Sequence, residues 1–247
     1  MDCSPKYSNP FLVEVISRLD FATPIKQFAT DLPKALIKEI LNNFKIMEPS
    51  EPQLVETPEG SVIAIKENVF YDENRKNRVV LTPTALFMDY KNYTSFEILK
   101  KQFIPIVESL YENNPNLLSR RFGLRYINKI FIQDVGISDW GKYLNDALLG
   151  IFAIMGENNN MLSRAFHNLS WNHGHYNLTL NFGIHNQDHP AIVRRNEFTI
   201  DLDAFYSGSL EYKEVEEKIE LFHTKIQELF EYSIKDPLRE KMEQDQT

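Results

Sequence analysis

Cysteine is almost absent from this chain, and its scarcity excludes two kinds of site. Cys3 is the only cysteine among 247 residues, so neither an intramolecular disulfide nor a cysteine-rich zinc site can form. Cys3 also lies close to the N-terminus, where we expect no formed pocket and no positioned base to activate a thiol nucleophile. Catalysis by Cys3 is therefore not expected.

Long apolar runs, a leader sequence and flexible linkers are missing as well. Nine glycines and twelve prolines leave little room for low-complexity linkers. No stretch approaches the roughly 20 consecutive apolar residues that a membrane helix requires. The opening segment MDCSPKYSNP has no cationic region followed by an apolar core, so it does not resemble a secretion signal. These absences predict a cytoplasmic protein without a membrane segment.

Positive charge is in short supply. The chain has 27 lysines and arginines against 35 aspartates and glutamates, which gives a formal net charge of −8. Affinity for a nucleic acid backbone comes from many lysine and arginine contacts to phosphate. We therefore do not expect a protein whose main function is to bind nucleic acid. The composition still permits a local basic patch.

Recognisable catalytic motifs are also missing. The sequence contains no glycine-rich phosphate loop, no serine nucleophile elbow and no metalloprotease helix motif. With 43% hydrophobic and 12% aromatic residues, the chain can nevertheless bury a substantial core. The sequence thus says more about architecture than about chemistry, and a non-catalytic protein is favoured over an enzyme.

The chain does contain an internal repeat. The segment FLVEVISRLDF, residues 11–21, aligns without gaps on FGLRYINKIFI, residues 122–132. At the same displacement, FATDLPKALIKEILNNF and DWGKYLNDALLGIFAIM each predict an amphipathic helix of about four turns. LFMDYKNYTSF and FTIDLDAFYSG also align, with Asp89 opposite Asp201, and a long helix follows each of them.

This repeat predicts the fold class. The order strand, helix, two to four antiparallel strands, helix occurs twice, in residues 1–118 and again in residues 119–247. We expect an α+β protein in which the two pseudo-repeats form one compact pseudo-dimeric domain, with helices on one face of a curved sheet. The other face of the sheet is then uncovered. Coincidental α+β periodicity is the alternative to duplication.

Strand alternation assigns side chains to the two faces. In the segment RFGLRYINKIFI, the register of Phe122 is expected under the helices, which places Arg121, Arg125 and Lys129 on the uncovered face. Glu14 is the counterpart of Arg125 in the repeat, so the two side chains could form an ion pair that fixes the strand register.

Two polar residues occupy the apolar register. Ser17 and Asn128 fall at equivalent positions of the repeat. Because an unpaired buried polar group is costly, we predict that both are hydrogen-bonded beneath the helices.

A further strand adds polar side chains to the uncovered face. In HYNLTLNF, Asn177, Thr179 and Asn181 alternate with leucines. Amides both donate and accept hydrogen bonds, so this row beside the arginines is suited to binding a polar ligand or a protein. A solvated polar face is the alternative interpretation.

Carboxylates support a rival hypothesis. Asp201 and Asp203 in DLDAF alternate onto one strand face, and together with Asp89 they could hold a divalent ion or act in acid–base chemistry. A metal-dependent hydrolase or nuclease would require these three carboxylates to converge in one pocket.

Five of the six histidines lie within residues 167–189. His173 and His175 flank a glycine turn, whereas His185 and His189 belong to the other end of a strand roughly 30 Å long. These two groups cannot share one ion, so the sequence predicts neither a metal site nor a cofactor.

Three segments resemble a known family. NPFLVEVISRLDF, RFGLRYINKI and LFHTKIQELFEYSI are similar, in order and spacing, to segments of a sporadically distributed prokaryotic family of about this length whose function is unknown. The resemblance covers nearly the whole chain and transfers no catalytic residue. It implies a bacterial or archaeal origin and the patchy occurrence typical of mobile and phage-defence genes.

The element order also looks like the duplicated saddle of the TATA-binding protein. A minor-groove saddle needs a basic surface and apolar wedges. Here the uncovered face is expected to carry Glu14, Asp89, Asp201 and Asp203, which would repel phosphate. A nucleic-acid-binding saddle is therefore kept only as an alternative.

Together these observations predict a binding protein. We expect a sensor, adaptor or regulatory component of a prokaryotic defence system that recognises a protein or polar ligand on the uncovered sheet face. The partner is expected to be a protein encoded nearby, and self-association is a further possibility. The candidate binding residues are Glu14, Arg121, Arg125, Lys129, Asn177, Thr179, Asn181 and Asp201.

Overall fold

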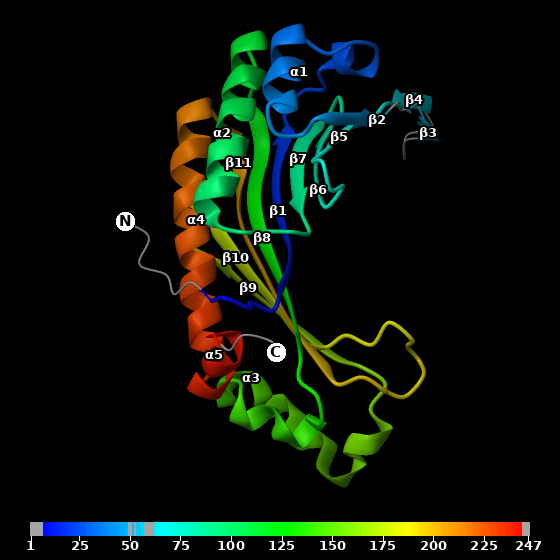
Figure 1. The fold of residues 1–247 in the computed structure, drawn as a ribbon, viewed down its shortest axis with the longest axis vertical. Coiled ribbons are helices and arrows are strands. Elements are labelled where there is room, and N and C mark those ends of the chain that lie inside the picture. The colour runs from blue at the N-terminus through cyan, green and yellow to red at the C-terminus, as the bar shows by residue number, and fades with distance from the viewer. Residues whose placement is uncertain (1–6, 49–50, 52, 57–61, 244–247) are drawn as a thin grey trace. The chain divides into compact units, whose positions relative to one another are not determined.

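The protein belongs to the α+β class, as the sequence predicts (Figure 1). The structure is a computed structural model that describes residues 7–48, 51, 53–56 and 62–243, so Cys3 lies outside the described residues. The strands are β1 (Leu12–Phe21), β2 (Ile46–Glu48), β3 (Gln53–Glu56), β4 (Val62–Ile65), β5 (Asn68–Tyr71), β6 (Asn77–Leu81), β7 (Ala85–Tyr90), β8 (Ser119–Phe131), β9 (Ala165–Asn172), β10 (Asn177–Ile184) and β11 (Glu197–Leu210). The helices are η1 (Lys26–Ala29), α1 (Lys34–Leu41), α2 (Phe96–Asn113), η2 (Ile137–Lys142), α3 (Asp146–Leu149), η3 (Gly150–Met161), α4 (Tyr212–Ser233) and α5 (Asp236–Glu243), where η denotes a 3₁₀ helix.

The chain forms two compact units, each built from segments that are far apart in the sequence. Unit 1 comprises Met1–Val13, Arg125–Ala204 and Thr224–Thr247. Unit 2 comprises Glu14–Leu124 and Phe205–His223. The sequence predicts two repeated halves, residues 1–118 and 119–247. These halves are defined by repetition in the sequence and the units by contacts in space, so the repeated halves stay a prediction.

In the described part of the chain, nine strands form one open antiparallel sheet in the order β2-β5-β6-β7-β1-β8-β11-β10-β9, and β3 pairs with β4 in a separate hairpin. Counting outward from β1 and β8, the order matches β7 with β11, β6 with β10 and β5 with β9. The sequence alignment pairs the same strands, β1 with β8 and β7 with β11. Because a shared order of elements does not test a common origin, duplication stays a prediction.

The helices pack against the apolar register of the strands, as expected. In unit 2, the ring of Phe122 on β8 lies 5.7 Å from the ring of Phe103 on α2 and 5.5 Å from that of Phe222 on α4. In unit 1, the indole ring of Trp140 on η2 lies 5.3 Å from the ring of Phe198 on β11. The cationic register of β8 is half-exposed, which confirms the predicted alternation.

The helical segments that follow β1 and β8 are shorter than predicted. The four-turn helix expected over residues 139–155 is replaced by η2, α3 and η3. The backbone N–H of Asn145 donates to the carbonyl oxygen of Ser233 (2.9 Å), and the N–H of Lys235 donates to that of Tyr143 (2.8 Å). These tertiary hydrogen bonds take backbone groups that a continuous helix would use, so packing overrides helix propensity here. After β1, Pro33 precedes a helix of only eight residues, α1.

The two polar residues of the apolar register differ in their bonding. Asn128 is buried, and its Nδ2 donates to the carbonyl oxygen of Ile200 (3.3 Å), which confirms that half of the prediction. Ser17 is fully buried, but its Oγ has no hydrogen-bond partner in the described part of the chain. The prediction of a bonded Ser17 is therefore wrong; its small hydroxyl is tolerated inside the apolar layer.

None of the described helices is both long enough and apolar enough to span a lipid bilayer.

Candidate functional site

A row of polar side chains crosses four adjacent strands of unit 1, on the face opposite the helices. Its members are Arg125 on β8, Asp201 on β11, Asn181 on β10 and Asn168 on β9, and we call this set the polar row. Strand alternation places them together: Arg125, Asp201 and Asn181 each lie between two buried residues, as Asn181 does between Leu180 and Phe182. Asn168 joins them because it lies opposite Asn181 in the β9–β10 register.

The strongest contact in the polar row joins Arg125 to Asp201. Nε of Arg125 donates to Oδ1 of Asp201 at 2.7 Å, and Nη2 donates to Oδ2 at 2.6 Å. This two-point geometry matches the planar guanidinium to the planar carboxylate. The Asp201 side chain is only 6% exposed, whereas that of Arg125 is 42% exposed, so the arginine covers the carboxylate.

Two amides extend this contact to the edge of the sheet. Nδ2 of Asn181 donates to Oδ2 of Asp201 (3.1 Å), and Nδ2 of Asn168 donates to Oδ1 of Asn181 (2.6 Å). The side chain of Asn181 thus uses both its acceptor and its donor within the row. The outer end, Asn168, is exposed to solvent. A connected row of this kind fixes the orientation of each amide.

A second pair of polar groups lies beside the polar row. The hydroxyls of Ser170 on β9 and Thr179 on β10 are 3.1 Å apart. Both belong to the polar-row face because Thr179 and Asn181 lie two residues apart on one strand. Asn177, one further step along β10, is half-exposed on the same face. The sequence-predicted residues Asn177, Thr179 and Asn181 therefore do line one surface of unit 1.

Sequence reasoning missed Asn168 and Ser170. The signal was present, because the segment AFHNLSWN places Asn168, Ser170 and Asn172 in one strand register. This pattern identifies Asn168 and Ser170 as site residues only when the neighbouring strand is known. The β9–β10 register places Asn168 opposite Asn181 and Ser170 opposite Thr179.

The carboxylates predicted on the uncovered face are not exposed to solvent. Asp89 is 3% exposed and Asp201 is 4% exposed. In unit 2, Nε of Arg78 donates to Oδ2 of Asp89 at 2.9 Å, as Arg125 does to Asp201 in unit 1. The long arginine side chains lie over these acids and compensate their charge. The expectation of solvent-facing acids at these two positions is thus corrected.

The other predicted cations lie in different surroundings. Lys129 lines a hollow of about 280 Å³ in unit 1, together with His185, Asn186, Gln187, Asp188, Arg194, Arg195 and Glu197. Arg121 belongs to unit 2, where its guanidinium lies over the ring of Phe205, 4.6 Å from the centroid. Glu14 is half-exposed on the unit 2 part of β1. Its predicted pairing with Arg125 stays a prediction.

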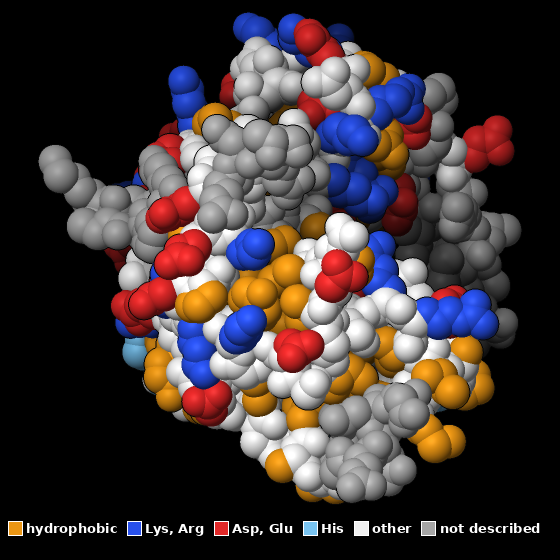
Figure 2. Space-filling model, turned by 60° about the horizontal axis from the view of Figure 1, so that its bottom comes forward, with side chains coloured by type: hydrophobic (Ala, Val, Ile, Leu, Met, Phe, Trp, Pro, Cys, Tyr) orange, Lys and Arg blue, Asp and Glu red, His pale blue; other side chains and the backbone are white. Residues whose placement is uncertain are grey.

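Charge of one sign does not dominate the surface drawn in Figure 2. Among the described residues in that view, lysine and arginine side chains are interspersed with acidic side chains and with patches of hydrophobic ones. A minor-groove saddle requires a continuous basic surface. The mixed charges on this face offer no such surface.

The described residues contain no group of three or more histidine, cysteine, aspartate or glutamate side chains that could hold a metal ion. The histidines of the β9–β10 hairpin instead contact aromatic rings. The ring of His173 stacks on Tyr176 with centroids 4.5 Å apart, and that of His167 lies 5.2 Å from Phe182.

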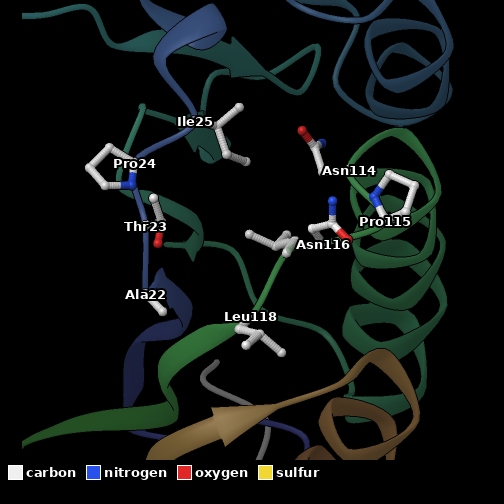
Figure 3. Close-up of a pocket in the computed structure, with 9 residues that line it drawn as sticks. Ala22, Thr23, Pro24, Ile25, Asn114, Pro115, Asn116 and Leu118 are labelled. Carbon is white, nitrogen blue, oxygen red and sulfur yellow. The ribbon is translucent and has the colours of Figure 1, made fainter.

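Unit 2 contains a pocket that the sequence did not predict. Its volume is about 310 Å³, and it lies between the loop after β1 and the loop after α2. Figure 3 shows Pro24 and Ile25 on one side and Asn114 and Asn116 on the other. A backbone hydrogen bond from Ala22 N to Leu118 O (2.9 Å) joins the two loops. Among the described residues no charged side chain lines this pocket, so they offer it neither a general base nor an ion partner.

Of the sites described above, the polar row contains the most sequence-predicted residues, and their hydrogen bonds define its geometry. These residues are Arg125, Asn181 and Asp201. The one carboxylate of the polar row accepts hydrogen bonds from Arg125 and Asn181 and is nearly inaccessible, so it is poorly placed to bind a metal or to move a proton. What the surface can offer is oriented hydrogen bonding. No protein-family model and no curated protein sequence matches the chain.

Proposed function

We propose that the protein is a non-catalytic binding protein that recognises a protein partner through the polar face of unit 1. The polar row carries this proposal. Its charged members compensate each other, while the exposed amide of Asn168 and the hydroxyls of Ser170 and Thr179 present hydrogen-bonding groups toward solvent. Groups that are already oriented lose little entropy on binding, which favours recognition.

The biological setting is proposed from the sequence resemblance alone. A sporadic occurrence among prokaryotes is typical of defence genes, so we propose a sensor or adaptor of a defence system whose partner is encoded by a neighbouring gene. The metal-dependent hydrolase is the weaker hypothesis, because Asp89 and Asp201 are each covered by an arginine.

The test is co-purification with the purified products of the genes that flank this one. We expect one of them to bind at a fixed stoichiometry. Thr179→Val and Asn177→Leu should each weaken that binding about five-fold, because each removes one hydrogen bond of about 1 kcal/mol. Thr23→Val is the matched control, since Thr23 is an exposed threonine of unit 2.

Two results would reject the proposal. One is a partner whose affinity is the same for the wild type and for both β10 variants. The other is magnesium-dependent hydrolysis of a nucleic acid or ester that is abolished by Asp201→Asn. This result would support the enzyme hypothesis.

A further inference from the structure

Strand β9 lies at one end of the nine-stranded sheet. In the part of the chain that the structure describes, its neighbour is β10, with which it pairs along its whole length from Ala165 to Asn172. Because the strand order ends at β9, the backbone N–H and C=O groups of its other edge have no strand partner among the described residues. Such an edge is a template for another strand, and monomeric proteins usually protect it with charged residues, proline or a bulge.

Strand β9 carries none of these protective features. Its sequence, AFHNLSWN, has no proline and no charged residue, and the absence of lysine, arginine, aspartate and glutamate continues from residue 165 to residue 187. A quarter of all residues in the chain are charged, so this neutral segment stands out. Apolar side chains are exposed along the strand: Phe166 at 37%, Leu169 at 45% and Trp171 at 38%.

We infer that β9 is a dimerisation strand that pairs antiparallel with β9 of a second copy of this chain. Closed two-fold symmetry is the commonest arrangement for identical chains. Each copy has a net charge of −8, which opposes association, so a contact between two copies is least unfavourable where the seam itself carries no charge. The uncharged strand provides such a seam.

Symmetry restricts the register of this pairing. A two-fold axis that relates antiparallel neighbours is perpendicular to the sheet, so the polar-row faces of both copies lie on the same side. Two residues that lie opposite each other must then have their side chains on the same face of the sheet. This condition excludes every second register of the two strands. Two equally centred registers remain, one with Asn168 and one with Leu169 on the axis. We choose the second, which places Leu169 opposite Leu169 of the second copy, because its cross-strand pairs match better.

In this register, the pairs are chemically matched. Asn168 lies opposite Ser170 of the second copy, so an amide that can donate meets a hydroxyl that can accept, whereas between β9 and β10 an amide pairs with an amide and a hydroxyl with a hydroxyl. His167 lies opposite Trp171 of the second copy, an aromatic pair of the type that stabilises sheets. This self-complementarity favours a second copy over an unrelated strand as the occupant.

The oligomeric state tests the inference. Sedimentation equilibrium of the full chain between roughly 1 and 200 µM should show a concentration-dependent dimer, as expected for a small interface. Leu169→Lys should weaken dimerisation at least ten-fold, because two ammonium groups would meet on the axis. Leu118→Lys is the matched control, since Leu118 is a leucine of unit 2 that is 46% exposed, against 45% for Leu169.

Cross-linking tests the register. In a Cys3→Ser background, Leu169→Cys should oxidise to a symmetric disulfide-linked dimer, whereas Trp171→Cys should not, because the two Trp171 positions lie four residues apart across the axis. A monomer at every concentration overturns the inference, as does equal cross-linking at both positions. Because Leu169 faces away from the polar row, loss of dimerisation is distinguishable from failure of the proposed partner recognition.

Discussion

Arg125 and Asp201 form a two-point charged contact in unit 1, with hydrogen bonds of 2.7 and 2.6 Å between the guanidinium and the carboxylate. A buried carboxylate is stable only if its charge is compensated. The pair thus allows an acid to sit in the middle of the polar row and to orient the amide of Asn181.

Removal of the arginine should therefore leave an uncompensated acid. We predict that Arg125→Met lowers the free energy of unfolding by about 2 kcal/mol, less than the 3–5 kcal/mol of fully buried pairs, because water can reach the half-exposed site. Urea denaturation measures this loss. The double variant Arg125→Met/Asp201→Leu should recover most of it.

The control for this experiment is Lys225→Met, which breaks the exposed pair of Lys225 with Glu228. It should cost less than about 0.5 kcal/mol. A cost of the same size for Lys225→Met and Arg125→Met would contradict a special role of the buried carboxylate.

The buried polar residues of the apolar register make an independent test. Asn128→Leu should destabilise the protein by about 1–2 kcal/mol, because it removes the hydrogen bond that the buried amide donates to the carbonyl oxygen of Ile200. Ser17→Ala should be neutral or slightly stabilising, because the Ser17 hydroxyl has no partner among the described residues. Equal effects of the two changes on the midpoint of thermal unfolding would refute this assignment.

The alternation of faces could be predicted from the sequence because it depends only on strand geometry. Phe122 is buried and Arg121 is not, as two-residue periodicity requires. The α+β class followed from the same patterns. The polar character of Asn177, Thr179 and Asn181 was likewise readable from one strand.

The contacts of the polar row could not be predicted, because they depend on which strands are neighbours in the sheet. A single sequence does not reveal the strand order. The partner of Asp201 is Arg125, far away in the chain, and the edge position of Asn168 follows from the sheet order. The helix expected at residues 139–155 failed for a related reason. The backbone N–H of Asn145 donates to Ser233, the last residue of α4, and the carbonyl oxygen of Tyr143 accepts from Lys235, so neither group serves a continuous helix.

Gly183 on β10 is required by a close approach to β9. Its φ angle is +125°, and a Cβ atom there would lie 2.1 Å from the carbonyl oxygen of Ala165. Gly183→Ala should therefore destabilise the protein by at least about 3 kcal/mol and separate the end of β9 from β10. Hydrogen exchange of the β9 amides would detect that separation.

The matched control is Gly174→Ala in the turn of the same hairpin. Gly174 also has a positive φ, +79°, but no atom lies within 4 Å of the position of an added Cβ. The substitution should cost only about 1 kcal/mol of backbone strain. Similar losses at both positions would show that the conformation, and not the contact with Ala165, makes Gly183 necessary.

Alkaline pH should destabilise the protein through three tyrosines whose pKa is raised in the folded state. The hydroxyl of Tyr111 donates to the carbonyl oxygen of Leu210 (2.9 Å), and burial raises the pKa of Tyr111 to about 12. Burial also raises the pKa of Tyr90 and that of Tyr7, where a hydrogen bond to Glu231 adds to the shift. An unfolded tyrosine titrates near pH 10, so above this pH the folded state binds more protons than the unfolded state. The stabilisation is thus complete below pH 10 and is lost as the pH rises toward 12.

We predict that Tyr111→Phe reduces this sensitivity. The variant should lose about 1 kcal/mol of stability at pH 7, where a hydrogen bond is removed, and the difference from the wild type should shrink between pH 10 and 12. Urea denaturation at several pH values measures both effects, with Tyr232→Phe at an exposed ring as the control. A difference that stays constant up to pH 12 would mean that the Tyr111 hydroxyl is as accessible to solvent in the folded protein as in the unfolded chain.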